Sequence, residues 1–412
     1  MKLKYLFLVF LCFIKSYSQE KDLNYFLGKA QTNSPLLSDL KNQIESASLD
    51  SLLFRATRKP QVSANLLANY APIIDNFGYD TALSNHHTVS GMVGVNQRIL
   101  GANQINSQSE TFKLIREALV LNKKIAVKDL NKTIIAQYIS ASASAEQIVY
   151  NQEIGALLKI ESLILKELAR NSVYKQTDYL IFSTTIKQQE LLLLQLKQQY
   201  QNDLALLNYL CGETDTIFVS LKKPEIVLKS IQNSEKMVFL KQFEVDSLKI
   251  RNQNKLIDNA YKPSISLLGD AGYWSSFVYL PYKNFGFSFG IGLSIPIYDG
   301  YQRSLQHQKN ENALATNLAY KNNFRRQYQQ QLLMLNQKLR QSAEVEKQLR
   351  SQLVIAEALI EANKKLLPSG DAQITEFVIA LGNLISTKNA ISQNNINKLE
   401  IINEINYWSF NE

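Results

Sequence analysis

Few side chains in this sequence have the type and spacing that catalysis requires. The three histidines are the pair His86 and His87, in a loop of variable length, and His307, in a helical pattern. No HExxH, phosphate-binding loop or nucleophile-elbow pattern is present. Two adjacent loop histidines can ligate a metal ion, although they are more often simply exposed to solvent. We therefore predict no catalytic residues, no metal and no bound cofactor, and we do not expect an enzyme.

The two cysteines add no site of this kind. Cys12 lies in the N-terminal apolar stretch and follows Val9, Phe10 and Leu11, whereas an acylated lipoprotein cysteine requires small residues before it. Cys211 is then the only thiol of the mature chain, which excludes an internal disulfide and a cysteine-based metal site. We expect Cys211 to be a small buried hydrophobic residue.

The N-terminus has the pattern of a secretion signal. Lys2 and Lys4 precede an apolar run over residues 5–14, and the small residues Ser16 and Ser18 follow. This run is too short for a permanent membrane anchor. We predict that residues 1–18 are a signal peptide and that the mature protein leaves the cytoplasm.

The charge of the mature chain is mild. Removal of the three lysines of the predicted signal lowers the net charge from +9 to +6. The remaining basic residues alternate with acidic and amide residues along helical segments, which is typical of solvated helix faces. Nucleic acid is therefore not expected as a partner.

The rest of the sequence is duplicated at a constant offset of 198 residues. At this offset Val93-Gly94-Val95 aligns with Ile291-Gly292-Leu293, and Asn208-Tyr209 aligns with Asn406-Tyr407. Lys59-Pro60 instead matches Lys262-Pro263 at an offset of 203, so the repeats differ in a loop. We predict a first repeat over residues 19–212, a linker over 213–230 and a second repeat over 231–412.

Each repeat contains long helical patterns. The first runs from about Asn103 to Ala169, which is roughly 100 Å at 1.5 Å per residue, and its counterpart runs from Tyr301 to about Leu366. Helices of this length imply coiled-coil packing rather than a compact domain. The second helix is rich in glutamine and asparagine, which suits a wall facing water. The helices are expected to turn back near residues 172–178 and 368–376.

Each repeat also contains a pair of strands with alternating side chains, at about residues 61–98 and 264–297. From Phe285 to Ile295 one face is large and apolar, and the other consists of glycine and serine. The other segments, residues 61–70, 88–97 and 264–273, alternate similarly, and about ten residues suffice for a strand to cross a bilayer. Aromatic residues near the strand ends suit an interfacial belt. These are Tyr70, Tyr79, Tyr273, Trp274, Tyr279 and Tyr282.

Four such strands cannot close a barrel alone, and open sheet edges are not stable in lipid. A barrel must therefore be shared between chains, with twelve strands from three copies or eight from two. A wide lumen favours twelve. The alternative is a four-stranded sheet packed on a soluble core, but few other elements remain to cover the phenylalanine-rich face.

The segment Ser294 to Arg303, with its proline and Asp-Gly pair, resembles the strand-to-helix junction of TolC-like outer-membrane efflux proteins. Residues 33–35, 58–62 and 206–212 are similar to other parts of that family, in the same order along almost the whole mature chain. The resemblance implies an α+β membrane protein: a homotrimer with a twelve-stranded transmembrane β-barrel continuous with a long periplasmic α-helical barrel, located in the cell outer membrane. It also implies a duct for efflux or type I secretion. The expected partners are outer-membrane lipid, a periplasmic adaptor and an inner-membrane RND or ABC transporter.

The resemblance further suggests specific residues. At the junctions these are Pro296, Asp299 and Gly300 in the second repeat and Gly101 in the first, where Asp299 suits a helix cap. The candidates for a channel constriction are Glu376, Asp178 and Asp371, all in the predicted tip bends. Glu376 matches an acidic ring position of the family, whereas Leu367 and Ala372 replace its gating tyrosine and arginine. An ordinary solvated helix residue is the alternative for Glu376.

A rival hypothesis is a periplasmic coiled-coil adaptor or structural protein without a channel. Such proteins have helical hairpins, but they need one hairpin and compact β domains rather than two repeats with amphipathic strand pairs.

Overall fold

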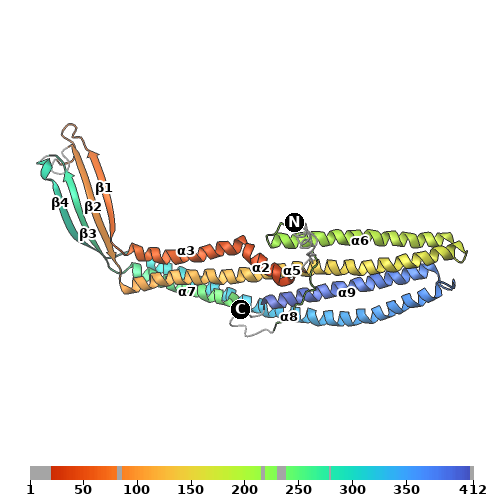
Figure 1. Ribbon diagram of the computed structural model, residues 1–412. Coiled ribbons are helices and arrows are strands. Elements are labelled where there is room, and N and C mark those ends of the chain that lie inside the picture. The colour runs from red at the N-terminus through yellow and green to blue at the C-terminus, as the bar shows by residue number, and fades with distance from the viewer. Residues whose placement is uncertain (1–19, 81–85, 215–218, 230–237, 278–279, 409–412) are drawn as a thin grey trace, which may run out of the picture. The chain divides into compact units, whose positions relative to one another are not determined.

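The computed structural model describes residues 20–80, 86–214, 219–229, 238–277 and 280–408 (Figure 1). The predicted signal peptide, Tyr279 and the start of the second predicted repeat lie outside these residues. In chain order the elements are α2 (Leu23–Asn33), α3 (Pro35–Thr57), β1 (Gln61–Tyr70), β2 (His87–Ile99), α5 (Ala102–Arg170), α6 (Gln176–Leu210), α7 (Val238–Ala260), β3 (Ser264–Ser275), the 3-10 turn η3 (Pro281–Lys283), β4 (Phe285–Ser294), α8 (Gln302–Leu366) and α9 (Ile374–Trp408).

The same order of elements occurs twice. In each half a helix of 23 residues leads into two strands, and a very long helix and a helix of 35 residues follow. The very long helices have 69 residues in α5 and 65 in α8. No helix in the described ranges combines the length and the hydropathy needed to cross a membrane.

The four strands form one antiparallel sheet in the order β1-β2-β3-β4. The first hairpin pairs Gln61 with Asn96, and the second pairs Ser264 with Ser294. The two hairpins join through β2 and β3, where Val93 lies opposite Ala271. The sheet therefore unites strands from both repeats.

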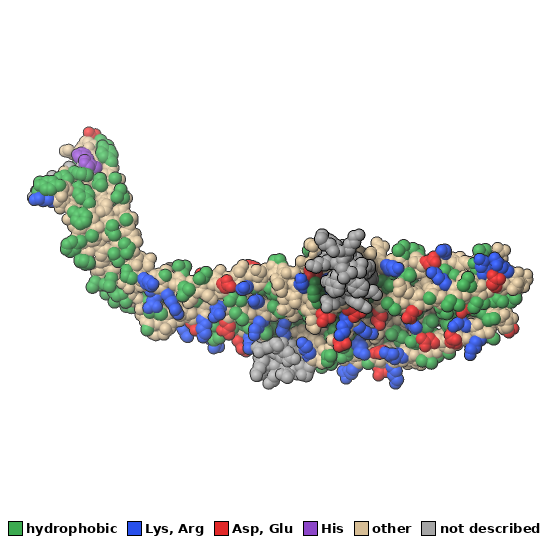
Figure 2. All heavy atoms as spheres, in the orientation of Figure 1, with side chains coloured by type: hydrophobic (Ala, Val, Ile, Leu, Met, Phe, Trp, Pro, Cys, Tyr) green, Lys and Arg blue, Asp and Glu red, His purple; other side chains and the backbone are tan. Residues whose placement is uncertain are grey.

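The chain divides into two compact units. We call Met1–Ser38, Lys124–Met237 and Phe324–Glu412 the helical unit, and Asp39–Lys123 with Val238–Asn323 the strand unit. The strand unit has a small core between α5 and α7, formed by Leu114, Ala118, Leu121 and Val245. In Figure 2 hydrophobic side chains cover much of the visible sheet, whereas charged ones concentrate on the helices.

The helical unit has two larger cores. One, which we call the tip cluster, lies where α5 meets α6 and α8 meets α9. Its buried members include Leu158, Phe182, Leu367, Ile374, Phe377 and Leu381. The other, which we call the N-terminal cluster, joins α2, α5 and α6. Its buried members include Phe26, Ile134, Tyr138, Ile148, Tyr200, Leu204 and Cys211.

Residues 219–229, which we call the equatorial segment, lie within the predicted linker. Leu221 forms an isolated parallel bridge with Lys21. The side chain of Asn406 accepts a hydrogen bond from the Lys229 backbone N–H at 2.8 Å and donates one to the Val227 carbonyl at 2.9 Å. These contacts hold the segment against Lys21 and α9.

Candidate functional site

One face of the sheet is apolar on all four strands. Residues directly opposite each other in an antiparallel sheet share a face, so the register traces rows of side chains across the strands. One row runs through Val62, Val95, Gly269 and Phe289. Phe289 is 85% exposed, and Leu66, two rows away on β1, is 87% exposed. We call this the apolar face.

The opposite face carries mainly small and polar side chains, interrupted by four larger ones: Leu67, Met92, Leu268 and Trp274. Its rows include Ser63, Gly94, Asp270 and Ser288, in that order across the sheet. We call it the small-residue face. The alternation predicted for residues 61–70 and 285–295 thus places the large side chains of both outer strands, apart from Leu67, on one side, where the described residues provide no covering layer.

Aromatic side chains lie at the loop end of the sheet. Tyr70 ends β1, Trp274 is the penultimate residue of β3, and Tyr282 lies in η3. All three are largely exposed, as is Tyr79 in the loop after β1. Aromatic side chains thus gather at this end of the sheet, where the sequence analysis expected an interfacial belt, although Trp274 lies on the small-residue face.

The second strand-to-helix junction is built around Asp299. Its carboxylate accepts hydrogen bonds from the backbone N–H groups of Tyr301 at 2.9 Å and Arg303 at 2.8 Å. The bond from Arg303 is the largest cause of a lowered pKa of the Asp299 carboxyl. Gly300 has a φ of +63°, which glycine adopts without a steric penalty. Asp299 thus caps the first turn of α8.

Pro296 lies two residues beyond the end of β4 at Ser294. Because proline has no backbone N–H, it cannot continue a strand ladder. Its place is therefore consistent with the end of pairing between β3 and β4, ahead of the capping turn.

The first junction uses different chemistry at the equivalent positions. Gly101 occupies the position of Asp299 at the 198-residue offset and has no side chain with which to cap a helix. Its backbone N–H instead donates to the side chain of Gln104 at 3.2 Å, and the Gln104 amide donates to the Asn259 carbonyl at 2.9 Å. Gln104, the third residue of α5, supplies the capping oxygen here.

An ionic cluster adjoins the second junction. Asp258 on α7 accepts hydrogen bonds from Arg303 at 2.7 Å and lies 3.0 Å from the ring of His307, both on α8. The Arg303 bond is the main cause of a lowered pKa of the Asp258 carboxyl. His307, one of the three histidines considered above, therefore helps to join two helices.

The other two histidines lie at the start of β2. His86 Nδ1 accepts a hydrogen bond from the Ile73 N–H at 3.4 Å, and the His87 ring packs near Phe277 with centroids 5.2 Å apart. Within the described residues, no group of three or more histidine, cysteine or acidic side chains is arranged to hold a metal ion. Cys211 is buried, and burial raises its pKa to about 11.

The two tip bends have the same backbone. Ser172 after α5 and Gly370 after α8 both have a positive φ, at +61° and +78°, and they are equivalent at the 198-residue offset. In each bend the next residue donates its N–H to a carbonyl five residues earlier: Val173 to Leu168, and Asp371 to Leu366. This is the Schellman ending of a helix, in which the left-handed position favours glycine.

Tyr174 links the two bends. Its hydroxyl lies 2.9 Å from the carbonyl oxygen of Leu367 and 2.8 Å from that of Ala372, and it can donate to either. Burial raises the pKa of Tyr174, so the hydroxyl remains protonated. Leu367 and Ala372, the positions where the resembled family has gating residues, are both buried and contribute backbone carbonyls here.

The sequence analysis predicted no role for Tyr174. A signal for it existed, because Tyr174 aligns with Ala372 at the 198-residue offset and is the aromatic residue of its bend.

The structure places the acidic candidates at the tip with local partners. Asp178 and Glu376 both lie in the first turn of their helices, α6 and α9. Asp178 accepts a hydrogen bond from the Lys175 N–H at 3.2 Å, and Glu376 lies 3.5 Å from the Gln373 N–H. The third candidate, Asp371, accepts one from the Ser369 hydroxyl at 2.6 Å. Each carboxylate thus stabilises its own bend, and Glu376 is the most weakly held.

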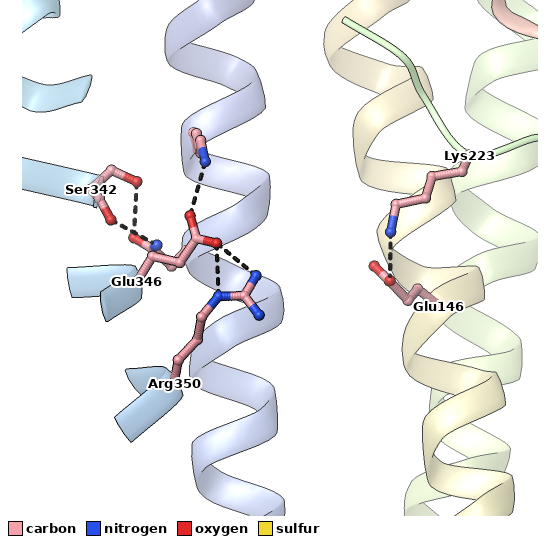
Figure 3. Close-up of polar contacts among 7 residues, drawn as sticks. Glu146, Lys223, Ser342, Glu346 and Arg350 are labelled. Atoms are coloured by element: carbon pink, nitrogen blue, oxygen red, sulfur yellow. Dashed lines mark hydrogen bonds and ion pairs between the residues drawn. The ribbon is translucent and has the colours of Figure 1, made fainter. Parts of the chain in front are cut away.

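Ion pairs join the helices above the tip. Glu346 on α8 accepts from Arg350 at 2.7 Å, one turn along the same helix, and from Lys398 on α9 at 2.9 Å (Figure 3). In the first repeat, Glu146 on α5 pairs with Lys223 of the equatorial segment at 3.3 Å (Figure 3). The hydrogen bond from Lys398 is the largest cause of a lowered pKa of Glu346.

Comparison with known proteins supports this architecture. Neither a protein-family model nor a curated protein sequence matches the chain. Among solved structures, the channel protein CusC matches with a TM-score of 0.78 and 12% identity, over 95% of this chain and 93% of CusC. The outer-membrane protein VceC of Vibrio cholerae matches with a TM-score of 0.74 and 13% identity, over 95% of this chain and 97% of VceC.

The outer-membrane channel MtrE of Neisseria gonorrhoeae matches with a TM-score of 0.74 and 13% identity, over 94% of this chain and 88% of MtrE. The resemblance to TolC-like outer-membrane efflux channels is therefore confirmed at the level of the fold, over nearly the whole chain.

Proposed function

We propose that this chain is one protomer of an exit duct in the cell outer membrane. In this proposal three copies each contribute four strands to a twelve-stranded barrel, and their helices form a tunnel in the periplasm. The similarity of the fold to outer-membrane channels supports the proposal. The main argument for it comes from the apolar face of the sheet.

The observation that carries most weight is the uncovered apolar face. A single-layer sheet with phenylalanine and leucine side chains more than 80% exposed has no stable arrangement in water. Strands of 10 to 13 residues are long enough to cross a bilayer at a tilt. Lipid would cover the apolar face, and water would meet the small-residue face.

The sheet edges support a barrel shared between copies. β1 and β4 each pair on one side only, so both leave a row of backbone groups open. Lipid provides no hydrogen bonds to such groups. Pairing of β1 of one copy with β4 of the next would satisfy them, and the family resemblance implies three copies.

We infer the partners from the same architecture. A periplasmic adaptor and an inner-membrane RND or ABC transporter would deliver small molecules or polypeptides to the helical end. The acidic residues Glu376, Asp178 and Asp371 are our candidates for lining the constriction there. The function is passage rather than catalysis.

A direct test combines localisation, mass and conductance. The protein is expected to fractionate with outer membranes, to run as a trimer in detergent and to conduct ions in planar bilayers. A stable, water-soluble monomer without conductance would refute the proposal and favour the adaptor hypothesis.

Two neighbouring positions on β1 provide a matched pair of variants. Leu66 lies on the apolar face and Asn65 on the small-residue face. Leu66→Arg should prevent stable insertion, because an arginine facing lipid costs about 2–4 kcal/mol near the bilayer midplane. Asn65→Arg should insert normally. Equal behaviour of the two variants in membrane fractionation would contradict a lipid-facing sheet.

A further inference from the structure

Asp270 is the only carboxylate in the four strands, all of which the structure describes. It lies in the middle of β3, as the seventh of the 12 residues of that strand. An ionisable side chain within a membrane-crossing segment is costly, and it almost always faces an aqueous interior where it acts on what passes.

The register places Asp270 on the small-residue face. Its neighbour on β2 is Gly94, which has no side chain, and its neighbour on β4 is Ser288. The Ser288 hydroxyl donates a hydrogen bond to the Asp270 carboxylate at 2.6 Å. This donor is neutral, so the negative charge is oriented but not neutralised.

No basic side chain compensates that charge in the described part of the sheet. Arg98 is the only lysine or arginine of the four strands, and it lies opposite Ser266. Ser266 is four residues from Asp270, which is roughly 13 Å along a strand. At physiological salt this separation exceeds the Debye length of about 8 Å, so the two charges act almost independently.

We propose that Asp270 sets a negative electrostatic potential in the barrel lumen and favours the passage of cationic over anionic solutes. The proposal rests on the proposed function, in which three copies would place three Asp270 carboxylates at one level of the lumen. It assigns a specificity-determining residue to the barrel, separate from the acidic candidates at the tip.

The test measures the potential with a cysteine in the same row. Ser63 lies opposite Gly94, which lies opposite Asp270, so Ser63 is two strands from the carboxylate, or about 10 Å. Ser63→Cys would be reacted with a cationic and an anionic methanethiosulfonate in reconstituted protein. The native Cys211 is buried with a raised pKa and should not react.

The expected result is faster reaction of Ser63→Cys with the cationic reagent. Adding Asp270→Asn should lower the ratio of cationic to anionic rates by about two- to fourfold at 0.01–0.1 M salt, and the difference should vanish at 1 M. Asparagine can still accept the Ser288 hydrogen bond. Adding Ser288→Ala removes that bond without changing the charge, and it should leave the ratio unchanged.

Leu66→Cys separates this inference from the proposed function. If the reagents modify Ser63→Cys but not Leu66→Cys, the two faces meet water and lipid as proposed. An unchanged rate ratio in Asp270→Asn would then overturn only the role of Asp270. If both cysteines react equally, the sheet is not a barrel wall, and the proposed function fails with it.

Discussion

The helical unit contains two equivalent helix pairs, α5 with α6 and α8 with α9. Two equivalent positions are apolar and buried in the first pair and oppositely charged in the second. In the first repeat, Ile148 on α5 and Tyr200 on α6 are buried in the N-terminal cluster. At the 198-residue offset the second repeat has Glu346 and Lys398, which form an ion pair at 2.9 Å. Two members of a buried apolar cluster in the first repeat thus correspond to a salt bridge in the second.

The difference in side-chain chemistry matches a difference in how each helix pair is covered. Phe26 of α2 and Val219 of the equatorial segment belong to the same cluster as Ile148 and Tyr200. The first helix pair therefore has a cover, under which apolar side chains are stable. Lys398 keeps 37% of its side chain exposed, so the second pair remains in contact with water. Equivalent backbone positions thus carry opposite chemistry where the burial of their side chains differs.

The largest effect is expected in the tip cluster. Phe377 is fully buried, and its counterpart Tyr179 in the first repeat is only half-buried. Phe377→Ala should lower the free energy of unfolding of the tip by about 3–5 kcal/mol, and Tyr179→Ala by about half as much. Hydrogen exchange of α6 and α9 in detergent would measure this. Equal losses would show that both repeats contribute equally to the core.

Tyr174→Phe tests the link between the bends. Loss of its hydroxyl should cost about 1 kcal/mol and leave the carbonyls of Leu367 and Ala372 without this donor. If the link keeps the tip narrow, single-channel conductance should rise. Tyr179→Phe, in the first turn of α6, is a control. A Tyr174→Phe channel with unchanged stability and conductance would assign the hydroxyl no role.

The ion pair of the second repeat predicts a dependence on pH. The pKa of Glu346 is lowered in the folded protein, chiefly by Lys398, so its contribution is present above the ordinary glutamate pKa. It is lost as the pH falls through the lowered value. Glu346→Gln should cost about 0.5–1 kcal/mol at pH 7 and nothing at low pH.

The exposed Glu344 offers a matched control for this prediction, because it lies on the same helix two residues away. Glu344→Gln should leave thermal stability unchanged at either pH. A loss in Glu346→Gln that persists at low pH would attribute the effect to packing rather than charge.

The left-handed residues of the tip bends allow a reciprocal exchange. Ser172→Gly should stabilise the first bend by about 0.5 kcal/mol, because glycine adopts a positive φ without strain. Gly370→Ser should destabilise the second by about 1 kcal/mol, since its Cβ would lie 3.0 Å from Val173. Thermal unfolding in detergent should show a higher unfolding temperature for Ser172→Gly and a lower one for Gly370→Ser. A change in the same direction for both variants would contradict the equivalence of the bends.

The smallest change in stability is expected at the acidic candidates for the constriction. For these residues the quantity to measure is the preference of the channel for cations. Glu376→Gln should lower the preference for cations in planar bilayers while changing stability by less than about 0.5 kcal/mol. Asp178→Asn is the equivalent change in the first repeat. If Asp178→Asn alone alters the preference, the constriction belongs to the first repeat.

Local patterns in the sequence were sufficient to predict much of this fold. The alternation around Phe289 predicted a strand with one apolar face, and the long helical patterns predicted α5 and α8 to within two residues at each end. The fold class follows from these elements, and the comparisons confirm it at the level of a four-stranded sheet and long helices.

Side-chain partnerships across the structure were not predictable in the same way. The bond from Tyr174 to the second bend joins residues 193 and 198 positions apart, and no local pattern encodes it. Asp270 was equally hidden, because one polar residue in a strand has no meaning until the register shows its neighbours. The exchange of Ile148 and Tyr200 for Glu346 and Lys398 becomes visible only when the repeats are aligned.

The junction of the two hairpins also constrains how the protein is made. β2 and β3 pair residues that are 166 to 186 positions apart, from Ile99 with Ile265 to Val89 with Ser275. Such distant pairing is slow, because a long loop must close before any contact forms. During synthesis the first hairpin must wait for its partner until more than half of the chain has been made. Until then only a two-stranded ribbon exists, which is marginally stable by itself. The order of strands thereby delays the four-stranded sheet until α5, α6 and α7, which lie between the two hairpins in the chain, have been synthesised.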